Sequence, residues 1–223
     1  MRKALRSNSK LKEARKVEQA LTYCEEIMIG QAKKNLFDYD ERGRKLSDIE
    51  LLAKLQHFGA ATRLVDFSKN VLNALWFCVS DKDLINDVGV LFGIDTDIIA
   101  GGGENFFDFR QDYSTFCDTL EKKNYKGKTN IWMVDAPVTT QRISAQHSVF
   151  LCSVCKDSVH GFFQLPEEDK YFKSIAITPD LKRSTLDIIS SHFDITPFTI
   201  FPDIEGFSSA NSSKWDFHEF ERW

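Results

Sequence analysis

Apolar residues recur at three- and four-residue steps from about Ser9 to Leu36, before any other pattern begins. This period places them on one face of a helix, so the sequence predicts a long N-terminal packing helix. Glu18 and Glu25 are expected mostly away from that apolar face, and the helix is expected to carry no chemistry. The apolar face consists of Leu11, Ala14, Val17, Leu21, Cys24, Met28, Ala32 and Leu36.

A helix–strand–helix pattern follows between Ser47 and Val79. Ser47 and Glu50 have the spacing of a capping box, which predicts a helix that begins there and ends at Gly59. Thr62–Phe67 alternates as a short strand does, and Ser68 and Asn70 supply capping side chains for a second helix.

The rest of the chain alternates short apolar runs with helical patterns, without the regular period or glycine fingerprint of a doubly wound nucleotide-binding fold. The run Gly89–Ile94 predicts a buried strand, and the chain after Phe193 is expected to be loop-like. We therefore predict an α+β fold with a mixed, largely antiparallel sheet, packed helices and a helical extension (1–45) before the main domain (46–223). Further strands are expected at Ile131–Val134, Ser148–Val154 and Lys173–Ile177, with a short turn or helix at Thr139–Ala145 and a helix from Pro179.

Composition excludes several classes of function. A net charge of -4 gives no overall electrostatic surface for nucleic acid. No apolar run approaches the roughly 20 residues of a membrane helix, and no signal-type segment follows the basic N-terminus, so we expect a cytoplasmic protein without membrane contact. Five cysteines without secretory context are expected to be reduced. Cys152 and Cys155 form a C-x-x-C pair that no second pair completes, which predicts a core role for Cys152 and no metal site.

Polar side chains interrupt the apolar sequence at the end of the helix that begins at Ser47 and along the strand that follows it. His57, Arg63 and Asp66 lie within ten residues of one another. Arginine and aspartate are seldom buried unless paired, so an Arg63–Asp66 pair is one interpretation, a structural clamp. The other is a ligand cleft, for which the rigid fork of arginine is suited. Gln146, at the entrance to a predicted strand, either fixes a turn or contacts a ligand.

Three ordered stretches resemble the FRG domain family. Gln56–Phe77, QHFGAATRLVDFSKNVLNALWF, is similar to the family form QHYGLPTRLLDWTxNPLxALYFA. Arg142–Phe150, RISAQHSVF, is similar to RxxAQxGxF, and Thr196–Gly206 is similar to a segment ending in LFPDLxG. The Phe-Arg-Gly tripeptide that names the family does not precede the signature, so either the chain begins after it or this member has lost it.

The resemblance implies a function for these polar positions. The strand order and polar positions of the family look similar to those of ADP-ribosyltransferases, which implies NAD as substrate and no metal. Gln146 and His57 are then the catalytic residues, although a glutamine cannot act as a base and only orients. The implied cofactor contacts are Thr62, Arg63, Asp66 and Arg142.

Two functions remain open from the sequence. The first is an ADP-ribosyltransferase-like effector or toxin in bacterial conflict or phage defence, acting on a macromolecular acceptor. The second is a non-catalytic module that binds a nucleotide, nucleic acid or protein and whose polar cluster is structural. A homodimer through the long helix or the aromatic C-terminus (Trp215, Phe217, Phe220 and Trp223) is a further expectation.

Overall fold

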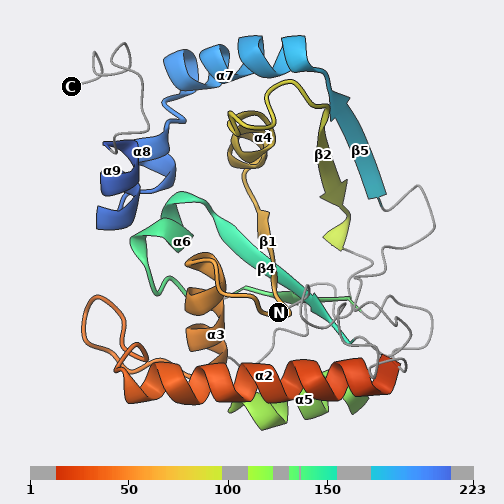
Figure 1. Cartoon of the computed structure of the whole chain (residues 1–223), viewed down its shortest axis with the longest axis vertical. Coiled ribbons are helices and arrows are strands. Elements are labelled where there is room, and N and C mark those ends of the chain that lie inside the picture. The colour runs from red at the N-terminus through yellow and green to blue at the C-terminus, as the bar shows by residue number, and fades with distance from the viewer. Residues whose placement is uncertain (1–13, 97–109, 123–130, 136, 155–171, 212–223) are drawn as a thin grey trace. The chain divides into compact units, whose positions relative to one another are not determined.

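The structure, a computed structural model, describes residues 14–96, 110–122, 131–135, 137–154 and 172–211. The first residues of the predicted long helix, Cys155 and the aromatic C-terminus lie outside these ranges. Described helices and strands alternate along the chain (Figure 1), which confirms the α+β class and the long N-terminal helix. The helices are α2 (Ala14–Lys34), α3 (Asp48–His57), α4 (Val71–Val79), α5 (Tyr113–Lys122), α6 (Gln141–Ala145), α7 (Pro179–Phe193), α8 (Pro197–Ile200) and α9 (Ile204–Ala210). The strands are β1 (Val65–Ser68), β2 (Gly89–Ile94), β3 (Ile131–Val134), β4 (Ser148–Ser153) and β5 (Phe172–Ile177).

The chain forms two compact units. The first comprises the described residues within 1–67, 92–140 and 149–174, and the second those within 68–91, 141–148 and 175–223. Both α2 and α3, which lie on either side of the predicted boundary after residue 45, belong to the first unit. None of the described helices has an apolar stretch long enough to cross a membrane.

The first unit combines helices α2, α3 and α5 with a three-stranded sheet of order β1-β4-β3. β3 and β4 are antiparallel, with Ile131 opposite Ser153 and Val134 opposite Phe150. Five consecutive residues of β4 are buried, as expected of a central strand covered on both faces. Helix α3 packs against both α2 and α5.

The local sequence explains the bounds of α3. The Ser47 hydroxyl accepts from the Glu50 backbone N–H, and the Glu50 carboxylate accepts from the Ser47 N–H at 2.8 Å, which confirms the predicted capping box. After the helix, Gly59 adopts a φ of +87°, a left-handed conformation that glycine tolerates best. The helix therefore stops directly after His57 and turns the chain toward β1.

The second unit is built on helix packing. Helix α4 packs against α7, and α8 contacts both α6 and α9. Asn70 caps α4 by accepting from the Leu72 N–H at 2.9 Å, as its position predicted. The core of this unit is formed by Trp76, Val79, Ile177, Ile189 and Ile200.

Three expectations about the fold are wrong. The strands form two sheets rather than one, because β2 and β5 pair separately. Strand β2 has no fully buried residue. The described chain after Phe193 contains two short helices, because Thr196 and Thr199 form a second capping box that starts α8 and α9 follows it.

Candidate functional site

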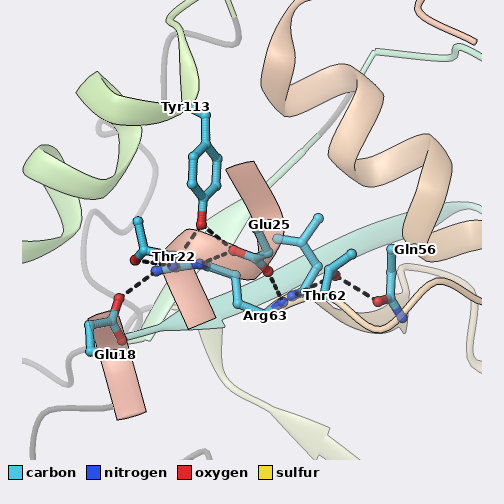
Figure 2. A network of polar contacts seen from close by, with 8 residues as sticks. Glu18, Thr22, Glu25, Gln56, Thr62, Arg63 and Tyr113 are labelled. Atoms are coloured by element: carbon cyan, nitrogen blue, oxygen red, sulfur yellow. Dashed lines mark hydrogen bonds and ion pairs between the residues drawn. The ribbon is translucent and has the colours of Figure 1, made fainter. Parts of the chain in front are cut away.

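Arg63 lies at the centre of a buried polar network in the first unit (Figure 2). Its side chain is 1% exposed and makes four hydrogen bonds, to Glu25, Glu18, Thr22 and Tyr113, with lengths from 2.7 to 3.0 Å. Its backbone N–H also donates to Glu25. Three of the four partners come from one face of α2, and Tyr113 begins α5.

Electrostatics keep this network charged. Burial lowers the pKa of the Arg63 guanidinium, but Glu25, Tyr113 and Glu18 together outweigh it and hold that pKa well above its ordinary value. Burial also raises the pKa of the Tyr113 phenol, so it stays protonated and donates to Glu25. Breaking such a buried pair typically costs about 3–5 kcal/mol. The network therefore ties the signature segment to α2 and α5.

The predicted Arg63–Asp66 pair is wrong. Arg63 turns toward α2, whereas Asp66 accepts from Gln56 Nε2 at 2.6 Å and is 46% exposed. Arg63 is a clamp, but its partners are Glu18 and Glu25. These two glutamates were expected away from the packing face of α2 and are instead 5% and 0% exposed. Their spacing around Thr22, four residues after Glu18 and three before Glu25, was the signal for one helix face.

A second series of hydrogen bonds lies within the signature itself. The Thr62 hydroxyl donates to Gln56 Oε1 at 2.7 Å and accepts from the Leu64 N–H at 3.0 Å. Gln56 in turn donates to Asp66. The oxygen and the nitrogen of the Gln56 amide therefore both make hydrogen bonds. This series of hydrogen bonds holds Asp66 in position beside the end of α3.

His57 lies beside Asp66 of this hydrogen-bond series, and one of its ring nitrogens has no hydrogen-bond partner among the described residues. Its side chain is 3% exposed, and Nδ1 lies 3.5 Å from Asp66 Oδ1. The ring meets Phe150 edge-on, with centroids 6.3 Å apart. Nε2 is buried and has no hydrogen-bond partner among the described residues. An imidazole oriented by a carboxylate on one nitrogen, with the other nitrogen unused, is the arrangement in which histidine accepts a proton or a hydrogen bond.

The remaining predicted site residues lie in the second unit. Gln146 is 6% exposed, and its side-chain amide donates to the Ile200 carbonyl at 3.1 Å. Arg142 makes two 2.6 Å hydrogen bonds to Asp203 and lies over the Phe201 ring. Here Arg142 joins the second and third family-like stretches.

The structure thus brings together His57, Thr62 and Asp66 in the first unit, with Gln56 as the linking residue that sequence reasoning did not single out. A ligand role for Arg63 or Arg142 stays a prediction, and it requires either side chain to leave its buried ion pair. The NAD contacts that the resemblance implies stay a prediction as well. The described part of the chain contains no group of three or more histidine, cysteine or acidic side chains that could hold a metal.

Comparison with known proteins identifies one family. The model of the FRG domain matches residues 3–86, which contain the signature and the α2 residues that bind Arg63. The match spans 84 of the 223 residues. No curated protein and no solved structure matches the chain.

Proposed function

We propose that this chain, whose residues 3–86 match the model of the FRG domain, is a non-catalytic module that binds a small molecule, with the signature arginine in a structural role. The binding position is the His57–Asp66 pair of the first unit. The module recognises its ligand there, and the Arg63 network keeps α2, α3 and β1 in the arrangement that holds this pair.

The observation that supports the proposal is that the Arg63 side chain already makes hydrogen bonds within the protein. Four of the five N–H groups that an arginine side chain offers already bind α2 and Tyr113. A phosphate in place of these partners would leave Glu25 buried without its cation, at a cost of about 3–5 kcal/mol. Phosphate binding by Arg63, on which an NAD site of the implied kind depends, is therefore disfavoured.

The test uses the purified chain with NAD, with nicotinamide release and the melting temperature followed in the same sample. We expect no release above the rate in buffer. Arg63→Lys should lower the melting temperature with or without ligand, because lysine cannot reproduce the fork that reaches both glutamates. Steady nicotinamide release that is lost on Arg63→Lys in folded protein would refute the binding-module proposal.

The His57–Asp66 pair favours a second candidate, an ADP-ribosyltransferase-like effector or toxin that uses NAD and modifies a macromolecular acceptor. In that function His57 Nε2 accepts a proton while Asp66 orients the ring, and Gln146 only orients, since an amide is no base. Nicotinamide release that disappears in both His57→Phe and Gln146→Ala, each still folded, would favour this candidate over the module.

A further inference from the structure

Two groups of the His57 site, the His57 Nε2 nitrogen and the Asp66 carboxylate, are hydrogen-bond acceptors. With the Nδ1 proton directed at Asp66, Nε2 carries a lone pair and has no partner. The Asp66 carboxylate is 46% exposed and uses one oxygen for Gln56. The Gln56 amide accepts from Thr62 and donates one N–H to Asp66, and its second N–H remains as a donor.

Two cations near this site along the sequence, Lys54 and Arg63, are committed elsewhere. Lys54, one turn before His57 on α3, donates to the backbone carbonyls of Phe37 and Tyr39 at 3.0 and 2.7 Å. Arg63 is held by Glu18 and Glu25. A phosphate at His57 would therefore meet the negative charge of Asp66, and neither of these two cations is available to offset it.

An unsatisfied buried nitrogen also carries a cost. Leaving a buried acceptor without a donor typically costs about 1–3 kcal/mol, and buried polar atoms in folded proteins normally have a partner. The simplest partner for such a nitrogen is a small hydrogen-bond donor, and a hydroxyl group is small, neutral and able to donate.

We infer that the ligand of this site is a neutral molecule with several hydroxyl groups, of the sugar or nucleoside class. The inference rests on the proposed binding function. One hydroxyl donates to His57 Nε2, and a second donates to the exposed carboxylate of Asp66. Recognition is then by hydrogen-bond donors, the opposite polarity from a phosphate site.

The experiment follows the imidazole nitrogens of the ¹⁵N-histidine-labelled full chain by NMR while D-ribose, adenosine or inorganic phosphate is added. We expect adenosine or ribose to move the Nε2 signal of His57 saturably and phosphate to leave it unchanged. His57→Phe retains an aromatic ring against Phe150 and should abolish binding. The matched control is His192→Phe, at an exposed histidine of α7, which should bind as the wild type does.

Asp66→Asn keeps the size of the side chain and removes its charge, and it should weaken adenosine binding roughly tenfold, the effect of losing one charged hydrogen bond. This variant also tests the site if His57→Phe does not fold. The inference is overturned if phosphate moves the His57 signal, or if no probe moves it and a bound water alone fills the position. Neither result depends on nicotinamide release, which separately decides whether the protein is an enzyme.

Discussion

Arg63 binds Glu25 twice, through its backbone N–H to Oε1 and through its Nε–H to Oε2 at 2.7 Å. The two residues are 38 positions apart in the sequence, and Glu25 is fully buried. A single glutamate of α2 therefore fixes both the path of the chain before β1 and the direction of the arginine side chain. The FRG-like signature is joined to the long helix through this contact.

Arg63→Ala should destabilise the protein by about 3–5 kcal/mol, because it leaves Glu18 and Glu25 buried without their cation. Denaturant unfolding monitored by circular dichroism measures the loss. Asp66→Asn is the control, since its exposed carboxylate makes no contact with Arg63 and its loss should cost less than about 1 kcal/mol. Equal losses in the two variants would contradict the assignment of Arg63 to the α2 network.

Local signals in the sequence predicted much of the fold. The capping box of Ser47 and Glu50, the left-handed Gly59 and the cap at Asn70 each depend on neighbouring residues alone, and all three are present. The short helix α8 was missed even though Thr196 caps it. The four residues of α8 are too few to show the apolar periodicity by which a helix is predicted from sequence.

Long-range partners could not be predicted in the same way. The period of α2 shows which residues share a face, but not that the face with Glu18 and Glu25 packs on Arg63. Asp66 was the nearest acid in sequence, and proximity in sequence is a poor guide when the chain turns at Gly59. His57 was identified as a site residue, but its partnership with Gln56 and Asp66 became visible only in the structure.

Stability should fall at alkaline pH because of Tyr113. Burial holds the pKa of its phenol above the ordinary value of about 10. Below pH 10 the folded and unfolded states both hold the proton, so the phenol adds no pH dependence. Above it the unfolded state releases the proton first, and the free energy of unfolding falls by up to about 1.4 kcal/mol per pH unit.

The measurement is denaturant unfolding of the wild type and Tyr113→Phe between pH 8 and 11. The buried thiol of Cys152, whose pKa is also raised by burial, contributes a similar fall to both proteins. Cys117 is replaced by serine in both proteins, because a hydrogen bond with Tyr113 is one of the causes that set its pKa. The difference between the two curves therefore isolates the phenol. Tyr23→Phe, at an exposed tyrosine of α2, should retain the full alkaline loss. Parallel curves for wild type and Tyr113→Phe would contradict the prediction.

Asp203→Asn should destabilise the second unit by about 3 kcal/mol, because Arg142 is buried and loses its main counter-charge. Asparagine still caps a helix well, so the contact from the Gly206 N–H to the side chain at 203 is retained and the loss reports the ion pair. Glu205→Gln is the matched control. Glu205 is 62% exposed and 3.3 Å from Arg142, so its loss should cost less than about 1 kcal/mol. Thermal unfolding of the two variants compares them directly, and a larger effect at Glu205 would be inconsistent with the bidentate pair.

Gly206→Ala tests the close approach of α9 to the preceding turn. Helix propensity alone favours alanine over glycine by about 1 kcal/mol, but a Cβ at this position would overlap the Phe201 carbonyl and side chain. Backbone atoms yield little, so the overlap should dominate and the free energy of unfolding of the variant should fall by about 1–3 kcal/mol.

Gly30→Ala provides the opposite case, because nothing lies within 4 Å of a Cβ there. It should gain about 0.5–1 kcal/mol from reduced unfolded-state entropy. Denaturant unfolding of both variants should therefore give changes of opposite sign, and a stabilised Gly206→Ala would show that α9 does not pack closely on Phe201.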